Sequence, residues 1–134
     1  MANLTYLSAN KINDYLFGGL SFTPPENYYL GISTTAINKN GAGITEPTDS
    51  VYERIQIPNL KTLFTTSANG IVSNSQAFSY EESLEPWGII THWFISSAPT
   101  GGEIWYAGSL TNSKTVEANT ALLLPIGALQ ITTD

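Results

Sequence analysis

The sequence predicts an all-β fold, an antiparallel β-sandwich or jelly-roll-like arrangement with one short N-terminal helix. Short alternating or apolar runs recur along most of the chain, and clusters of Gly, Pro and Asn separate them. A helical spacing of apolar residues occurs before residue 20. The 134 residues make one typical domain. We therefore expect a helical arm over residues 1–20 and a β-sandwich over residues 21–134, together forming one folding unit.

The expected helix lies between Ser8 and the pair Gly18-Gly19. Serine is a preferred N-cap residue, and glycine readily ends a helix in the left-handed conformation. Between these ends, Ile12, Tyr15 and Leu16 share one face. A helix of about ten residues is marginal by itself. Its apolar face must therefore dock on the chain's own sheet or on a neighbouring subunit.

The first half of the chain after this helix follows a β pattern. Pro24-Pro25 prevents further helix. The expected strands are 28–33, 51–57, 61–66, 70–74 and 77–80. Residues 34–50 are rich in Asn, Gly and Pro and predict a long irregular loop. Long loops in small domains are usually functional or held by a partner.

The second half gives the clearest strand, residues 88–97, which is rich in Ile and aromatic residues. The turn signal at 98–102 predicts that residues 103–110 return as its antiparallel partner. Shorter strands are expected at 114–117, 120–124 and 128–132, with turns at Ala118-Asn119 and at 125–127.

Composition excludes several classes of function. Only 12% of the residues are charged, against about 25% in typical proteins. The abundant Ser, Thr and Asn side chains lose little entropy when another protein covers them. This composition either favours extensive contact with neighbouring proteins or reflects the Thr content of a β protein. The net charge is −6 and the basic residues are scattered, which argues against nucleic-acid binding.

The sequence also predicts no membrane segment. The first residues lack the basic and apolar regions of a signal peptide, and the purely apolar run 121–124 is too short to cross a bilayer. We expect the protein to be made and to fold in the cytoplasm, unless a larger assembly carries it out.

The titratable residues show no catalytic constellation. His92 is the single histidine, so no zinc site with two histidines can form. If residues 88–97 alternate regularly, Ile90, His92 and Phe94 lie on one face, and we expect a structural histidine. The chain contains no cysteine. We therefore expect no enzymatic activity and no cofactor.

One acidic cluster has two interpretations. It consists of Glu81, Glu82 and Glu85. Clustered carboxylates can bind calcium, because hard cations prefer oxygen ligands. The cluster lacks the spaced Asp residues and the glycine of a calcium-binding loop. A solvated loop is therefore the favoured interpretation, and we assign no metal site.

The aromatic residues are candidates for an interaction surface. Adjacent strand residues face opposite ways, so one of Trp93-Phe94 and one of Trp105-Tyr106 faces outward or into a subunit contact. Exposed aromatic rings would also suit carbohydrate binding. Together with the helix face, the candidate interaction surface comprises Ile12, Tyr15, Leu16, Trp87 and Trp105.

Several short blocks, spread along nearly the whole chain, are informative together. In the first half they are Met1-Ala2-Asn3-Leu4, Tyr15-Leu16-Phe17-Gly18-Gly19, Phe22-Thr23-Pro24-Pro25, Tyr29-Leu30-Gly31-Ile32 and Tyr52-Glu53-Arg54. In the second half they are Trp87-Gly88-Ile89-Ile90-Thr91-His92, Gly101-Gly102, Tyr106-Ala107-Gly108-Ser109-Leu110, Lys114-Thr115-Val116 and the block from Pro125 to Thr132. In order and spacing they resemble a family of small phage virion proteins generally labelled phage tail fibre proteins.

The resemblance implies a structural subunit on the surface of a tailed bacteriophage virion. Such a subunit is a tail fibre-type protein or a capsid decoration (cement) protein, and it contacts tail proteins or the major capsid protein. We expect a homo-oligomer. The alternative is a carbohydrate-binding module that recognises a glycan on the host surface.

The chain departs from the family pattern at two places. Val51 stands where members tend to have Gly, and Asn119-Thr120 replaces a Gly-Asp turn. Both changes affect turns or the start of a strand, so we expect them to leave the fold in place.

Overall fold

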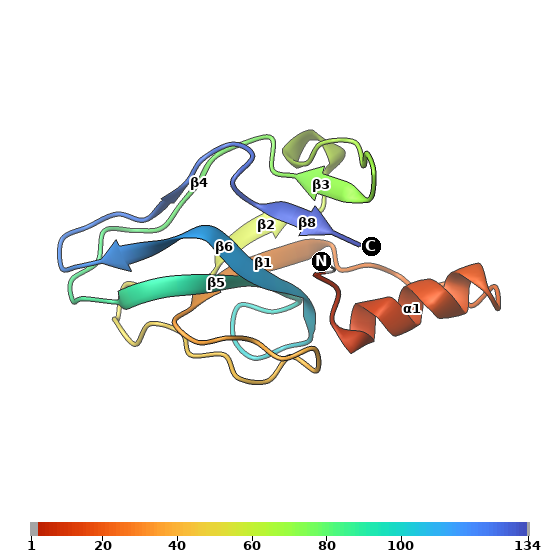
Figure 1. The fold of residues 1–134 in the computed structure, drawn as a ribbon, viewed down its shortest axis with the longest axis horizontal. Coiled ribbons are helices and arrows are strands. Elements are labelled where there is room, and N and C mark those ends of the chain that lie inside the picture. The colour runs from red at the N-terminus through yellow and green to blue at the C-terminus, as the bar shows by residue number, and fades with distance from the viewer. Residues whose placement is uncertain (1–2, 134) are drawn as a thin grey trace.

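The computed structural model describes residues 3–133 and shows one four-stranded antiparallel sheet with two two-stranded sheets over it (Figure 1). The large sheet has the order β2-β1-β5-β6. Its strands are β2 (Ile55–Pro58), β1 (Asn27–Ser33), β5 (Gly88–Ser96) and β6 (Ile104–Val116). The small sheets pair β3 (Ile71–Ser73) with β8 (Gln130–Thr132), and β4 (Phe78–Ser79) with β7 (Leu123–Leu124). The helix α1 is Tyr6–Leu16, and a 3₁₀ turn, η1, is Lys61–Leu63.

The predicted antiparallel all-β class with one short helix is confirmed. The predicted strand at 61–66 is wrong, because the N–H groups of Leu63 and Phe64 bond back to Leu60 and Lys61 and close the 3₁₀ turn η1. The jelly-roll arrangement and the two segments 1–20 and 21–134 stay predictions. Residues 1 and 134, the outer limits of those segments, lie outside the described residues.

The predicted strands 103–110 and 114–117 form one strand, β6, which pairs with β5 along most of its length. A register shift makes this possible. Ile90 of β5 pairs with Lys114 of β6, and His92 pairs with Ser109. Two positions along β5 therefore correspond to five positions along β6. The extra residues of β6 form an irregular bulge, and pairing continues on both sides of it.

The same register shift decides which residues of β5 face the core. Ile90, Trp93 and Ile95 all belong to the buried core cluster between the large sheet and the small sheets. Phe94 is fully buried but lies outside that cluster. The expectation that Ile90, His92 and Phe94 share one face is therefore wrong, because the bulge interrupts the alternation between Ile90 and His92.

Phe94 anchors a second buried layer on the other side of the large sheet. It packs on Gly31 of β1, where any Cβ would overlap the Phe94 ring. The Arg54 guanidinium lies 4.8 Å from the ring centroid. Arg54 forms a two-pronged ion pair with Glu46, at 2.9 and 3.0 Å, and its Nη1 donates to the carbonyl of Ala98. Arg54 thus fastens the predicted irregular loop 34–50 and the turn 98–102 to the sheet.

Asp49, also in this loop, is a buried acceptor of four hydrogen bonds. Its Oδ2 accepts from the N–H groups of Leu84 (2.7 Å) and Glu85 (2.9 Å) and from the indole of Trp87 (3.0 Å). Its Oδ1 accepts from the N–H of Val51 at 3.3 Å. Burial raises the pKa of Asp49, but these hydrogen bonds favour the charged form more strongly and lower its pKa to about 2.

This pKa predicts a specific acid sensitivity. An unfolded aspartate has a pKa of about 3.9, so the ionised side chain is favoured in the folded state. The stability that it contributes is present above about pH 4 and is lost as the pH falls toward about 2. Asp49→Asn should therefore be less stable than the wild type near neutral pH, and the difference in melting temperature should shrink over this pH range.

Circular dichroism melts across that range check the prediction. Glu81→Gln, which changes an exposed carboxylate, is the control and should follow the wild type. A difference between Asp49→Asn and the wild type that stays constant with pH would contradict the assigned role of the Asp49 charge.

Candidate interaction surface: the projecting helix

Helix α1 projects beyond the end of the sheets (Figure 1). Its first turn lies against β6, whereas residues 13–20 are all exposed. The helix follows directly on residues 3–5, which run beside β6. In the order β2-β1-β5-β6, β6 is an edge strand. The segment before the helix therefore covers an edge that would otherwise present unpaired backbone groups.

Two hydroxyls fasten the start of the helix to this edge. The Thr5 hydroxyl donates to the carbonyl of Ile104 at 2.6 Å, and the Ser8 hydroxyl donates to the carbonyl of Trp105 at 2.5 Å. Both residues are buried. The helix begins at Tyr6, with Thr5 as an N-cap that makes no capping hydrogen bond. The expected N-cap role of Ser8 is wrong, because its hydroxyl is used by β6.

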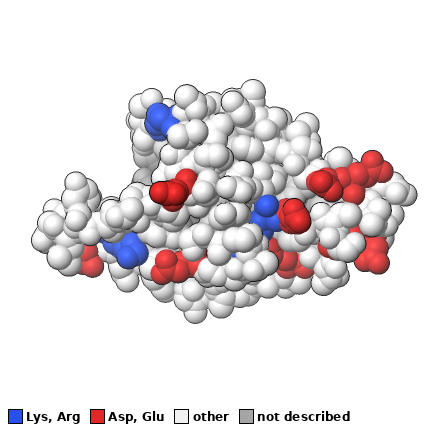
Figure 2. Space-filling model, turned by 180° about the vertical axis from the view of Figure 1, so that it is seen from behind, with Lys and Arg blue, Asp and Glu red and all other residues white. Residues whose placement is uncertain are grey.

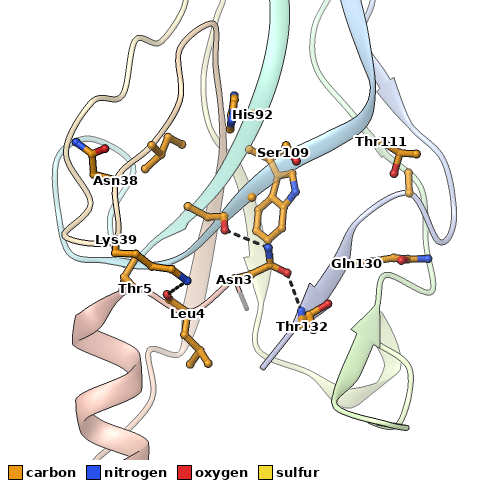
Figure 3. A pocket seen from close by; sticks show the side chains of 15 residues that line it. Asn3, Leu4, Thr5, Asn38, Lys39, His92, Ser109, Thr111, Gln130 and Thr132 are labelled. Carbon is orange, nitrogen blue, oxygen red and sulfur yellow. Dashed lines mark hydrogen bonds between the residues drawn. The ribbon is translucent and has the colours of Figure 1, made fainter. Parts of the chain in front are cut away.

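Asn3 joins β6 to β8 immediately before the helix (Figure 3). Its carbonyl accepts from the N–H of Ala107 at 2.9 Å, and its own N–H donates to the carbonyl of Thr132 at 2.7 Å. Its side chain repeats both links, to Ala107 at 3.2 Å and to Thr132 at 2.7 Å. The loop 34–50 adds Lys39, whose Nζ donates to the carbonyl of Leu4 at 3.1 Å. The base of the arm is thus held by three parts of the fold.

The far end of the helix exposes a cluster of large apolar residues, which we call the arm tip. Its members are Tyr15, Leu16, Phe17 and Leu20, with exposed fractions of 54%, 66%, 87% and 65%. Together they expose on the order of 500 Å² of mainly apolar surface, distributed around the end of the helix, which is comparable in area with the largest apolar patches of monomers. Gly19, at φ 67°, ends the helix as predicted. Such a patch indicates a surface that another molecule covers.

The apolar stripe of the helix starts on the sheet and continues past it. Ser8, Ile12, Tyr15 and Leu16 share one face, because their spacing is four, seven and eight residues from Ser8. Exposure increases along the stripe: Ser8 is buried, Ile12 is half-buried, and Tyr15 and Leu16 are exposed. Within residues 3–133, the last turn has one aromatic neighbour, Phe22, whose ring centroid lies 6.4 Å from that of Tyr15. Ile12, Tyr15 and Leu16 therefore remain candidates for a subunit contact.

The structure corrects the other two residues of the predicted surface, since Trp87 and Trp105 are each only 5% exposed. Trp87 packs edge-on against Tyr52 and Tyr80, at 5.5 and 6.1 Å between ring centroids. Trp105 does face away from the core cluster, but the arm covers that side, and the Phe22 ring lies 6.0 Å away. Neither ring is accessible to a partner in a single chain. The Trp105 indole N–H is buried and has no hydrogen-bond acceptor among the described residues.

A second surface feature is an apolar groove between the large sheet and the β3–β8 pair, with a volume of about 430 Å³. We call it the groove, and it is lined by Tyr28, Leu60, Phe64, Ile95, Tyr106 and Ile131. Burial raises the pKa of both Tyr28 and Tyr106, so both phenols stay neutral at physiological pH. Sequence reasoning missed the groove, because its walls come from six separate segments of the chain.

A third feature is a polar pocket of about 310 Å³ beside the base of the arm (Figure 3). It is lined by side chains that include Asn38, Lys39, His92, Ser109, Thr111 and Gln130. His92 is half-buried, and its Nδ1 shares a hydrogen bond of 2.7 Å with the hydroxyl of the neighbouring Thr91. The lining offers amide, hydroxyl, imidazole and ammonium groups, which can hydrogen-bond a polar ligand.

The charged residues are unevenly distributed. Glu81, Glu82, Glu85 and Glu117 are all exposed, close to the start of β5 and the end of β6. Figure 2 shows acidic side chains gathered at the end of the molecule opposite the projecting helix. Among residues 3–133, no three His, Cys, Asp or Glu side chains converge in a way that could hold a metal ion. Within the same residues, no helix has the length and apolar character needed to span a bilayer.

Comparison with known families places these features in context. Residues 3–132 match the model of the family described as Podophage GP4 fiber I protein gp80. The match includes Asn3 at the base of the arm, α1, and all of the strands. No curated protein matches the chain.

The anchoring of the arm can be tested with Ser8→Ala. Alanine has the higher helix propensity, so the helix itself should gain stability. Loss of the buried hydrogen bond to the Trp105 carbonyl should instead lower the free energy of unfolding by about 0.5–1.5 kcal/mol. It should also speed amide hydrogen exchange along α1. Urea titration and exchange measured by mass spectrometry check both effects. Asn13→Ala, an exposed site in the same helix, is the control, and equal behaviour of the two variants would contradict the anchor.

Proposed function

The chain belongs to the family of the podophage GP4 fiber I protein gp80, and on this premise we propose that it is a surface subunit of a tailed bacteriophage virion that works as a homo-oligomer. Membership identifies a structural phage protein and implies a place in the virion. The proposal adds assembly into an oligomer, display on the particle surface and contact with other virion proteins. The family's description as a fiber protein favours the tail over the capsid as the site of attachment.

The observation that carries the proposal is the exposed arm tip. A short helix is stabilised mainly by packing of its apolar face, yet Ser8 is the one fully buried residue of α1, and residues 13–20 are all exposed. Phe17, the most exposed of the large apolar residues, lies at the far end of the arm. Leaving these residues in water forfeits the free energy that their burial would contribute. A subunit contact covers them, and the low content of charged side chains lowers the entropy lost in that contact.

The polar pocket lacks the arrangement of side chains that catalysis by an activated nucleophile would need among the described residues. Its one histidine forms a hydrogen bond with its neighbour Thr91. Catalysis by an activated nucleophile would instead need a base that contacts the nucleophile and is itself oriented by a third group. The Ser109 hydroxyl, which also lines the pocket, is in an exposed residue. The pocket therefore fits a binding role better than an enzymatic one.

Assembly is tested by replacing the most exposed residue of the arm tip. Phe17→Glu should weaken self-association by at least about 2 kcal/mol, roughly 30-fold in the dissociation constant, as expected for a central interface aromatic. Native mass spectrometry and sedimentation velocity measure the oligomer. Leu84→Glu is the matched control, because Leu84 is 60% exposed and lies in the acidic loop before β5.

The location on the particle is tested by labelling the protein in intact virions and imaging by electron microscopy. Label on the tail supports the tail fibre-type role. Label on the capsid, together with higher heat stability of particles that contain the protein, would support the cement role instead. A wild-type protein that is strictly monomeric and absent from purified particles would overturn the proposal.

A second candidate function is recognition of a host-surface glycan, and the polar pocket is the observation that favours it. Its volume of about 310 Å³ lies at the lower end of the range for small-ligand sites, roughly 300–1,000 Å³. Sugar hydroxyls both donate and accept hydrogen bonds, which suits Asn38, Ser109 and Gln130. Trp87 and Trp105 do not serve as stacking surfaces for a sugar, because both rings are buried.

Calorimetric titration with purified host-surface polysaccharide tests the second function. Gln130→Ala removes an exposed lining side chain and should weaken binding by about two- to tenfold, the equivalent of one hydrogen bond. Gln76→Ala changes an exposed glutamine outside the pocket and should bind like the wild type. No binding by the wild-type protein, or equal binding by both variants, would rule out the pocket as a glycan site.

A further inference from the structure

We propose that the arm tip of one copy of this chain inserts into the groove of a second copy. This inference rests on the proposed function, because it names the contact through which the oligomer forms. The two halves of the contact are on the same chain. One is the cluster Tyr15, Leu16, Phe17 and Leu20, and the other is the groove next to η1.

The groove has the size and chemistry to accept the arm tip. An apolar cavity of about 150 Å³ holds a benzene ring. At about 430 Å³, the groove has room for the Phe17 ring and at least one neighbouring leucine. Leu60 lines the groove and is itself 55% exposed, so an inserted side chain would cover apolar surface on both partners. Burial of apolar surface on both sides is what stabilises a permanent contact between subunits.

The arm cannot reach the groove of its own chain. Its base packs on the Trp105 side of β6, whereas the groove is lined by Tyr106 and Ile95. Adjacent residues of a strand point to opposite faces, so the base of the arm and the groove lie on opposite sides of the large sheet. The hydroxyls of Thr5 and Ser8 hold the base there. A second copy can approach the arm tip without disturbing these hydrogen bonds.

The distribution of charge also favours a second copy as the occupant. The net charge of −6 makes two copies repel each other. The exposed residues Glu81, Glu82, Glu85 and Glu117, however, lie close to the Gly88–Val116 pair, at the start of β5 and the end of β6. The groove is at the other end of these strands, where Ile95 pairs with Tyr106. The groove thus lies away from these acidic residues, and Asp14 on the arm has the opposite charge to Lys61 at the groove. Glu26 is the exception, because its carbonyl accepts from the N–H of Asn59 at the groove.

Mixing two complementary variants tests the proposal. Phe17→Glu removes the arm contact and keeps the groove, whereas Leu60→Glu changes the exposed rim of the groove and keeps the arm. Each variant alone should associate roughly 30-fold more weakly than the wild type or worse. An equal mixture should form mixed pairs held by one wild-type contact, because the intact arm of Leu60→Glu can enter the intact groove of Phe17→Glu. Native mass spectrometry, with one variant isotopically labelled, identifies the mixed species. Leu84→Glu should assemble as the wild type does.

The outcomes separate this inference from the proposed function. Loss of assembly in Phe17→Glu but normal assembly in Leu60→Glu would overturn the groove contact and leave the oligomer standing. A mixture that stays monomeric would also overturn the inference. A wild-type protein that is monomeric at all concentrations would overturn both.

A photo-crosslinking experiment provides an independent test that does not depend on lost assembly. A p-benzoylphenylalanine placed at position 17 should crosslink, between copies, to residues 60–64 or to Tyr28 and Tyr106. Circular dichroism checks that the labelled protein keeps the wild-type fold. Crosslinks from position 17 to the arm of the other copy would show helix–helix packing instead and would overturn the proposal.

Discussion

The hydrogen bonds that residues 3–8 donate to and accept from the edge of β6 are the constraint on which the arrangement of the arm depends. They use the backbone groups of Ile104, Trp105 and Ala107, which an edge strand leaves unpaired. One consequence is that this part of the edge is closed to strand addition by another protein. The other is that the arm is held at its base and its last turn stands clear of the sheets. A single anchoring contact thus both blocks uncontrolled edge pairing and presents the apolar surface that assembly would use.

Both faces of the large sheet are covered by other parts of the chain. On one face the two small sheets close over the core cluster. On the other face the ion pair of Arg54 with Glu46 and the ring of Phe94 hold the loop 34–50 against the sheet. The same loop carries Asp49, which orders the turn before β5, and Lys39, which contacts the base of the arm. The loop was expected to be functional or held by a partner, and the structure shows that it packs extensively on its own chain.

The contact between the arm and β6 leaves one polar group unpaired. The Trp105 indole N–H is buried beneath the arm with no acceptor among residues 3–133, and an unpaired buried donor costs about 1–3 kcal/mol. Trp105, Thr5 and Ser8 are nevertheless almost fully buried, so the contact between the arm and β6 is closely packed in spite of this unpaired donor.

Local patterns in the sequence determined the all-β class, the helix, the glycine that ends it and the positions of β1, β5 and the turn at 98–102, because alternation, helical spacing and turn residues act between near neighbours. Tertiary structure alone decided the rest. The bulge opposite Thr91 turned Phe94 away from the core, and this depended on how β6 pairs with β5. Trp105 is buried because the arm covers it, and Trp87 is buried with its indole N–H donating to Asp49. The groove forms only where six separate segments of the chain come together. These outcomes rest on contacts between residues far apart in the chain, which no local pattern specifies.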